Sequence, residues 1–580
     1  MKKDHFAEFE KFLPFVRSPG QYIGGEFNSI VKPDARLRFA LCFPDTYAIG
    51  MSHLGIQILY HIVNGLDGVA AERFFAPEAD MEAELRKRGI PLLSLETHRP
   101  LCEFDLVGFS IQYELCYTNV LTMLDLGGIT LRACERREGE PLVIAGGATV
   151  FAPEPMADFF DLFVLGDGEE AVVRLCEIYE ACRGQPRAAV VEAMARGVPG
   201  AYAPSLYEAE YSSGKLAAIR PRSAAAAFPV RKAVVQDLES APFPTAPIVP
   251  FVETVHERIV IEVSRGCPHG CRFCQAGSVR KPVRHRSIRK VIELAEESYR
   301  HTGYDEIALA ALSVTDYPDL VELVRRLNER FEERRVGVSL PSLRIGRALL
   351  QMPAVVSAVR KSGLTLAPEA ATDRLRAIIR KNVTDADLFE AAESAYEHGW
   401  RLLKLYFMIG LPGESDKDAE AIPELAWKLS ELRRKIAGGP AAINVTVSTF
   451  IPKPHTPFQW DKMATEEYIA GRQYWIRKHI PAERIHIKFS PFPVSLLEAV
   501  LCRGDRRVSK LIECAWRRGA RLDAWNEHFR FESWRAAFEE SGIDPSFYAH
   551  REIPADECLP WEHIDSGHSK QTLLRLRGQT

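Results

Sequence analysis

The sequence predicts an α/β protein: a doubly wound parallel domain, then a partial (β/α)6 barrel, then a small, mostly helical C-terminal region. Short apolar runs alternate with helical periodicity over about residues 30–200 and again from Ile259, and this alternation is typical of parallel βαβ units. With 580 residues the chain is also too long for one core, since single cores stop growing near about 250–300 residues. We place the four segments at 1–200, 201–257, 258–484 and 485–580.

The first domain is predicted from apolar strands that alternate with helices. We expect strands at 36–45, 104–112, 141–147 and 160–168. Helical periodicity is present at 53–66, 118–129 and 169–183. Glycines follow several of these strands, and glycine there lets a ligand approach the carboxyl edge of a parallel sheet, which is the general binding crevice of a Rossmann-like domain.

The segment 201–257 has a different composition. It contains an alanine run at 224–227 and the proline-dense stretch APFPTAPIVPF at 241–251. Proline removes a backbone donor and fixes φ, so this stretch cannot sustain a helix or a central strand. We therefore expect a linker or a strap between the two larger units.

The second unit is predicted as a partial TIM-type barrel. Six strands, each followed by a helical stretch such as 289–303, fall between Ile259 and residue 484. They are expected at 259–266, 306–314, 336–345, 364–370, 402–414 and 442–452. In the remaining C-terminal segment, 516–542 is the clearest helical pair.

Composition excludes several classes of protein. Hydrophobic residues make up 46% and charged residues 26% of the chain, which is ordinary for a globular protein and excludes long disorder. No apolar run approaches the ~18 residues of a membrane helix, and the charged start MKKDHFAEFEKF is not a signal peptide. A net charge of −4 argues against a polyanionic partner. Twelve cysteines without an export signal indicate reduced thiols and a cytoplasmic location.

Three of the cysteines, Cys267, Cys271 and Cys274, lie within eight residues directly after the first barrel strand. Gly266, Pro268 and Gly270 exclude a regular helix there, so the segment is an open loop on the catalytic face of the barrel. Three converging thiolates can hold an iron–sulfur cluster and leave one iron of a cubane open. The alternatives are a zinc site with His269 or His285 as fourth ligand, and an accidental group of thiols.

The motif C-x₃-C-x₂-C, with Phe273 before its last cysteine, resembles that of the radical S-adenosylmethionine (radical SAM) superfamily. The resemblance implies a [4Fe–4S] cluster on Cys267, Cys271 and Cys274, whose open iron chelates S-adenosylmethionine. One electron, supplied by a reductant such as flavodoxin or ferredoxin, would cleave S-adenosylmethionine. The resulting 5′-deoxyadenosyl radical would remove a hydrogen atom from the substrate. The substrate stays open: a small molecule, a protein or RNA.

The resemblance also implies supporting roles for residues at the strand ends. Phe273 would present its backbone to the adenine, and Ser313 stands where related enzymes have an acidic Gly-Gly-Glu-like segment for the methionine amine. Glu369 would meet the ribose hydroxyls or the amine; its alternative role is that of an acid at a helix N-terminus. Gly410 and Gly413 resemble the turn near the adenine, and the alternative is a simple tight turn.

The first domain resembles the cobalamin-binding domain of one large class of these enzymes, which makes cobalamin a candidate second cofactor. The glycines that would line its crevice are Gly50, Gly146, Gly147, Gly166 and Gly168. The D-x-H-x-x-G signature is absent, because Met51 and Ile56 replace its acid and glycine around His53. We therefore expect any bound cobalamin to lack a histidine ligand from His53. The alternative is a degenerate domain used for packing or substrate binding.

Nearly the whole chain resembles an uncharacterised bacterial family of radical SAM proteins with a cobalamin-binding-like domain. The segments that indicate this are 19–28, the proline-rich strap, 450–460 and 559–567. The leading hypothesis is radical methylation or a related modification of an unactivated carbon.

Two other functions stay open. One is a methylthiotransferase that modifies RNA or protein, with Cys42, Cys102 and Cys116 holding a second cluster. The other is a non-catalytic iron–sulfur or zinc interaction protein. The stretch from Arg265 to Lys290, with eight basic residues and no acid, would balance the anionic cluster or guide a phosphate-bearing substrate.

Overall fold

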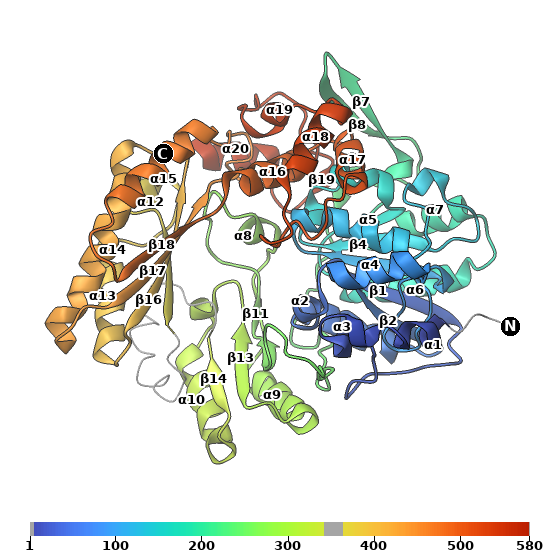
Figure 1. Cartoon of the computed structure of the whole chain (residues 1–580), viewed down its shortest axis with the longest axis horizontal. Helices are drawn as coiled ribbons and strands as arrows, with labels where there is room; N and C mark the ends of the chain where they lie inside the picture. Colours follow the sequence, from blue (N-terminus) through green and yellow to red (C-terminus); the bar gives the residue numbers. More distant parts are fainter. Residues whose placement is uncertain (1–4, 341–362, 579–580) are drawn as a thin grey trace.

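The computed structural model describes residues 5–340 and 363–578, and it confirms the predicted α/β class. Two bodies built on parallel sheets lie side by side, and C-terminal helices join them along one edge (Figure 1). In the described residues no helix has both the length and the apolar character that crossing a bilayer requires.

The first body is a six-stranded sheet in the order β2-β1-β3-β4-β5-β6. Neighbouring strands pair in parallel except β5 and β6, which are antiparallel. The strands are β1 (Leu37–Phe43), β2 (Val69–Phe75), β3 (Leu106–Ile111), β4 (Leu142–Gly147), β5 (Leu162–Val164) and β6 (Ala201–Tyr202). The order reverses between β1 and β3, so the crevice of this sheet opens there, at the carboxyl ends of those strands.

Helices cover both faces of this sheet (Figure 1). They are α2 (Tyr47–Met51), α3 (Leu54–Gly65), α4 (Ala79–Arg88), α5 (Tyr117–Leu126), α6 (Glu169–Ala181) and α7 (Arg187–Gly197). Strand β2 was not expected, because it contains Glu72 and Arg73. Both are buried and satisfied: Glu72 pairs with Arg38, and Arg73 pairs with two glutamates.

The barrel consists of two parallel sheets. One contains β10 (Ile259–Glu262), β13 (Glu306–Ala310) and β14 (Gly337–Ser339). The other contains β15 (Leu364–Glu369), β16 (Leu402–Ile409), β17 (Ala442–Thr449) and β18 (Ile485–Phe489). The expected strand at 336–345 falls partly outside the described residues. Strand β18 corrects the predicted boundary at residue 484, because the segment assigned to the C-terminal region begins with a barrel strand.

Helices pack on the outer side of both barrel sheets (Figure 1). In the first half these are α9 (Ile288–Thr302) and α10 (Leu320–Phe331), preceded by the short α8 (Gln275–Val279). In the second half they are α12 (Asp373–Ile378), α13 (Asp385–Glu397), α14 (Asp416–Ala437) and α15 (Glu466–Lys478).

The segment 201–257 is only partly the irregular strap that its composition indicates. It contains an unexpected hairpin, β7 (Tyr207–Ser212) and β8 (Lys215–Pro221), and the short β9 (Val230–Arg231), which pairs with β19 (Ile564–Asp565) near the C-terminus. Residues 232–258, all of them described, contain no helix or strand. The proline-dense part therefore has the irregular form that was predicted.

The C-terminal helices extend the core of the first body. They are α16 (Phe492–Arg503), α17 (Val508–Arg517), α18 (Phe531–Ser541), α19 (Pro545–Ala549) and α20 (Lys570–Gly578). Leu511, Ile512 and Trp516 of α17 belong to the same buried cluster as β1 and β3, and Trp516 donates a hydrogen bond to Thr122 of α5 at 3.1 Å. The expected helical pair at 516–542 is displaced, because α17 already ends at Arg517.

Candidate functional site

The three-cysteine loop leaves the first barrel strand through a glycine that the backbone requires. Gly266 has φ +94°, and a Cβ there would lie 2.7 Å from the carbonyl oxygens of Arg280 and Pro282. Only glycine fits this close approach without strain. The loop therefore turns away at the carboxyl end of the strand and presents Cys267, Cys271 and Cys274, all partly exposed, on the catalytic face.

The thiols of this loop lie close enough to influence one another. Burial raises the pKa of Cys274 to about 11, and the neighbouring Cys271 and Cys267 add to the rise. The Gly277 N–H donates a hydrogen bond to Cys274 Sγ at 3.3 Å, where helix α8 begins. Hydrogen bonds of this kind to a ligating sulfur tune the potential of a bound cluster.

The donor set fits a cluster better than a single ion. No group of three His, Cys, Asp or Glu side chains among the described residues could hold one metal ion. The two histidines considered as a fourth zinc ligand have other partners: His285 Nδ1 lies 2.6 Å from Ser264 Oγ, and His269 Nε2 lies 2.7 Å from Asp316 Oδ2. Three thiols, with no fourth protein ligand in the part of the chain that the structure describes, match a [4Fe–4S] cluster with one open iron.

Asp316 was not identified from the sequence. It follows β13 in the short 3-10 helix Val314–Asp316, accepts a hydrogen bond from the Ser313 hydroxyl, and lies against His269 of the cysteine loop. Ser313 itself is buried, so the carboxylate of Asp316 is the more accessible polar group at this strand end. The sequence does contain a signal for it: Asp316 is an acid three residues after Ser313, close to the place where related enzymes have an acidic segment.

Glu369 is the last residue of β15 and has φ +67°. Its carboxylate lies 3.1 Å from Lys381 Nζ. Burial raises its pKa, and it lies near enough to Cys274 to raise the pKa of that thiol. Helix α12 begins only at Asp373, with Thr372 as its N-cap, so Glu369 is not an acid of the first helical turn. It is a strand-end carboxylate beside the cysteine loop.

The turn after β16 lies against the cysteine loop. Gly410 and Gly413 have φ +80° and +76°, and the Glu414 carboxylate closes the turn by accepting the Gly410 N–H at 2.9 Å. Leu411 packs in one apolar cluster with Phe273, together with Phe450, Phe458 and others. The structure thus brings Phe273, Glu369 and this turn together around one side of the three cysteines.

A cavity of about 420 Å³ lies between the first body and the barrel. Its floor is the carboxyl edge of the first sheet, where Gly146, Gly147, Gly166 and Gly168 all line it. Gly147 and Gly166 have positive φ, and a Cβ on either would lie within 2.3 Å of a backbone oxygen. Gly50 does not contribute as expected: it packs against Phe75, and it is not among the lining residues.

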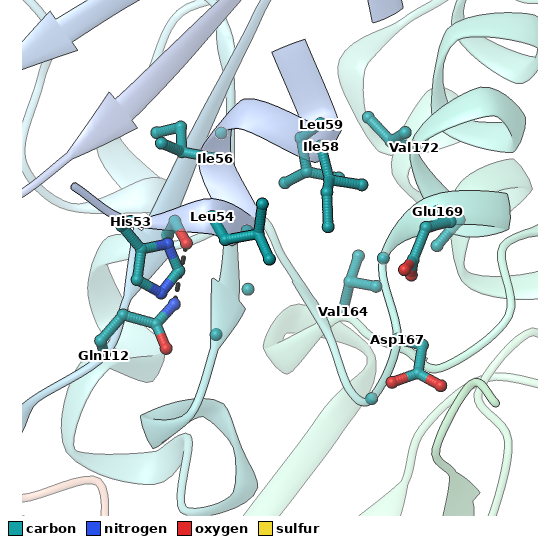
Figure 2. Close-up of a pocket in the computed structure, with 18 of the residues that line it drawn as sticks. His53, Leu54, Ile56, Ile58, Leu59, Gln112, Val164, Asp167, Glu169 and Val172 are labelled. Atoms are coloured by element: carbon teal, nitrogen blue, oxygen red, sulfur yellow. Dashed lines mark hydrogen bonds between the residues drawn. The ribbon is translucent and has the colours of Figure 1, made fainter. Parts of the chain in front are cut away.

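The opposite wall of this cavity belongs to the barrel. Glu262, Arg265 and Gly266 line it from the end of β10, and Leu312 lines it from the end of β13. Because Gly266 directly precedes Cys267, the cavity reaches the base of the cysteine loop. Apolar side chains of α3 and α6, among them Leu54, Ile58 and Val172, face the cavity (Figure 2).

His53 borders the cavity beside Gln112 (Figure 2). Its Nδ1 is buried and has no hydrogen-bond partner among the described residues. Burial, with the nearby Arg280, lowers the pKa of His53 to about 4, so the ring is neutral. A Cβ on Gly55 would lie 2.7 Å from the ring, so glycine makes room for it.

Ion pairs hold the two walls together. Asp167, between β5 and α6, lies 2.6 Å from Arg284 and 3.2 Å from Arg265. Glu169 lies 2.6 Å from Arg265. Burial alone would raise the pKa of Asp167, but these arginines lower it below its ordinary value. Arg265 and Arg284 of the basic stretch Arg265–Lys290 therefore join the two bodies, a role that neither sequence-based interpretation included.

Comparisons with known proteins agree with this geometry. The family described as "Radical SAM proteins, N-terminal" matches residues 55–204, and "Radical SAM superfamily" matches residues 261–426. An uncharacterized protein of Methanocaldococcus jannaschii is 26% identical over 507 residues, which are 87% of this chain and 97% of that protein. The ribosomal protein uS12 methylthiotransferase RimO of Desulfotalea psychrophila is 27% identical over 176 residues, only 29% of this chain and 39% of RimO.

Among solved structures, the radical S-adenosylmethionine methyltransferase TsrM of Kitasatospora setae, solved with cobalamin and a [4Fe–4S] cluster, has a similar fold. Its TM-score is 0.52 at 13% identity, over 87% of this chain and 100% of that one. The second family match contains all three cysteines of the loop, Glu369 and the Gly410–Gly413 turn. The cysteine motif, its position on the barrel and both family matches show that the chain belongs to the radical SAM superfamily and is an enzyme that uses a [4Fe–4S] cluster and S-adenosylmethionine.

Proposed function

We propose that this enzyme methylates or otherwise modifies an unactivated carbon, with cobalamin bound in the cavity between its two bodies. One observation carries the proposal: the cavity runs from the glycine-lined edge of the first sheet to Gly266, the residue before Cys267. A cofactor on that floor would face the same space as a cluster on the cysteine loop. We also propose flavodoxin or ferredoxin as the reductant.

The chain's own residues have separable roles in this proposal. Cys267, Cys271 and Cys274 hold the cluster, which supplies the electron that cleaves S-adenosylmethionine. Asp316 and Glu369 are carboxylates on either side of the loop, suited to the methionine amine or the ribose hydroxyls. The apolar cluster around Phe273 and Leu411 excludes water from that side.

The cavity has the character of a cofactor site. Its volume of about 420 Å³ falls in the usual range for ligand pockets. Most of its lining residues are apolar or glycine, and nine are polar: His53, Ser110, Gln112, Asp167, Glu169, Glu262, Ser264, Arg265 and Arg280. TsrM, described as a methyltransferase with cobalamin and a [4Fe–4S] cluster bound, has a similar fold over its whole length.

The methylthiotransferase alternative has less support. Cys42 is buried within β1, and Cys116 is buried with its Sγ 3.7 Å from Asp45 Oδ2, whereas Cys102 is exposed. Burial raises the pKa of both Cys42 and Cys116, which opposes the thiolate that a cluster needs. The match to RimO also covers well under half of either protein.

Anaerobic reconstitution of the full chain with iron and sulfide tests the proposal. We expect the absorbance of a [4Fe–4S] cluster, reductive formation of 5′-deoxyadenosine from S-adenosylmethionine, and stoichiometric binding of hydroxocobalamin. A reconstituted protein that forms 5′-deoxyadenosine but binds no corrinoid would exclude the cobalamin part and leave the first body a packing or substrate-docking role. A protein that binds zinc and forms no 5′-deoxyadenosine would exclude the proposal as a whole.

A further inference from the structure

The second barrel sheet has two faces of opposite character. On strands β16, β17 and β18, one set of alternating residues packs beneath α13, α14 and α15 in a single apolar cluster that includes Leu405, Val445 and Ile485. The other set points away from the helices, toward the barrel interior. Leu402, Met408 and Ala442 of that inner set are apolar, and its other seven members are polar: Lys404, Tyr406, Asn444, Thr446, Ser448, His486 and Lys488.

The strand register aligns these residues in two rows. Lys404 pairs with Asn444, which pairs with His486. Two residues further along, Tyr406 pairs with Thr446, which pairs with Lys488. Strands lie about 4.8 Å apart and rise about 3.3 Å per residue, so the Cα atoms of Lys404 and Lys488 are roughly 12 Å apart. Lysine side chains are long enough that Lys404 and Lys488 can contact one small ligand from two sides across this distance.

Apart from Ser448, which accepts a hydrogen bond from the Ser490 hydroxyl at 3.3 Å, most of these side chains are accessible to a ligand. Asn444, His486 and Lys488 are exposed, and Tyr406 retains 41% of its accessible surface. Neither Lys404 nor Lys488 forms an ion pair or hydrogen bond with any residue in the described part of the chain. Strands β16, β17 and β18 contain no acidic residue, so their two ammonium groups are not neutralised from their own face.

The polar face lies below the cofactor end of the barrel. Strand β16 runs directly into the Gly410 turn, and that turn packs against Phe273 of the cysteine loop. Of the two rows, the one with Tyr406, Thr446 and Lys488 lies nearer to this turn, so a molecule held there would face the end of the barrel that carries the cysteine loop. This placement separates the face from the cavity, which is lined by the first body and by β10 and β13.

We propose that the inner face of β16–β18 binds the substrate and that the substrate is a small anionic molecule bearing a carboxylate or phosphate group. Lys404 and Lys488 contact the anion, and Tyr406, Asn444 and Thr446 donate or accept hydrogen bonds around it. The inside of a barrel suits a small molecule, and the chain's net charge of −4 does not favour a long polyanion. This inference rests on the proposed function, because it names the substrate class of the same site.

Calorimetric titration of the full chain, reconstituted with its cluster and saturated with S-adenosylmethionine, tests the proposal. The probes are inorganic phosphate and succinate, in separate experiments that distinguish a phosphate from a carboxylate group. We expect at least one to bind, and its affinity to fall at least tenfold in the Lys404→Gln/Lys488→Gln double variant. Lys488→Arg should retain binding because it keeps the charge. Lys435→Gln, an exposed lysine of the last turn of α14, is the matched control and should match the wild type.

Equal binding by the wild type and the double variant, or no binding of either probe by the wild type, would overturn the proposal. Binding of a single-stranded RNA oligonucleotide that the double variant loses would also overturn it, in favour of an RNA substrate. Formation of 5′-deoxyadenosine without substrate is measured in parallel on the wild type and on the Lys435→Gln control, and it should be the same in both. If the wild type formed none, the proposed function would fail while the anion-binding result would stand on its own.

Discussion

Filling the cavity with a leucine at Gly146 should weaken corrinoid binding while leaving the fold intact. Gly146 is the second-last residue of β4 and lines the cavity floor. A Cβ at this position would meet only the Val164 carbonyl oxygen, at 3.9 Å, and its φ is not in the left-handed region. The neighbouring Gly147 could not be used, because its φ is +113° and its Cβ would lie 2.3 Å from the Ile111 carbonyl oxygen.

The size of the effect follows from where the added atoms go. In the ligand-free protein the leucine enters apolar space, so we expect the free energy of unfolding to change by less than about 1 kcal/mol. In the complex the same atoms compete with the ligand. Overpacking costs about 1–3 kcal/mol, which corresponds to a dissociation constant about 5- to 150-fold higher. Gly146→Ala, which adds one methyl group, should have a smaller effect in the same direction.

Equilibrium dialysis of hydroxocobalamin against the reconstituted chain measures the effect, with the melting temperature recorded for each variant. Gly139→Leu is the control, because Gly139 is exposed in a turn and a Cβ there has no atom within 4 Å. It should bind like the wild type. If Gly146→Leu bound hydroxocobalamin as tightly as the wild type with an unchanged melting temperature, the cavity would not be the corrinoid site.

Three further outcomes test the site. Replacing Cys267, Cys271 or Cys274 with Ala should remove the ~400 nm absorbance and all S-adenosylmethionine cleavage, because thiolates hold the irons; a triple variant that kept its iron would refute the assignment. Glu369→Gln should weaken S-adenosylmethionine binding about 10- to 150-fold, because it loses a charged hydrogen bond of about 1.5–3 kcal/mol, with little change in melting temperature. A lower melting temperature of the Glu369→Gln variant, with unchanged affinity for S-adenosylmethionine, would instead show that Glu369 stabilises the fold through its ion pair with Lys381. Bound cobalt(II) should give the same paramagnetic resonance spectrum in the wild type and His53→Ala; nitrogen splitting lost in the variant would show that His53 ligates cobalt.

The alternation of strands and helices was visible in the sequence because strands covered on both faces are continuous apolar runs. Strands that depart from that rule were missed. Strand β2 contains a buried Arg73 whose partners, Glu26 and Glu96, lie far along the chain. Strand β18 has a polar inner face with His486 and Lys488, so its five residues resemble a surface segment. The β7–β8 hairpin is short and largely exposed.

Some residues of the candidate site could likewise be identified from the sequence, and others could not. The cysteine loop was identified because its ligands are adjacent in sequence, and their chemistry requires that spacing. Asp316 contacts the loop through His269, 47 residues away, and no local pattern indicates such a contact. The cavity wall likewise combines Gly146 with Gly266. Contacts between remote segments depend on how the two bodies dock, which periodicity and composition do not encode.

Because each body supplies only one wall of the cavity, an occupant would bind fully only when the bodies are docked. By thermodynamic linkage, the bound molecule then stabilises the docked arrangement of the two bodies. At a ligand concentration of one hundred times the dissociation constant, the free energy of this stabilisation is about 2.7 kcal/mol. This free energy would add to the contribution of the ion pairs of Asp167 with Arg265 and Arg284, which lie at the same interface between the two bodies. Binding of the cofactor and docking of the two bodies would thus be one coupled equilibrium. A chain synthesised without the cofactor would have a less stable interface between the bodies and would be more open to proteolysis.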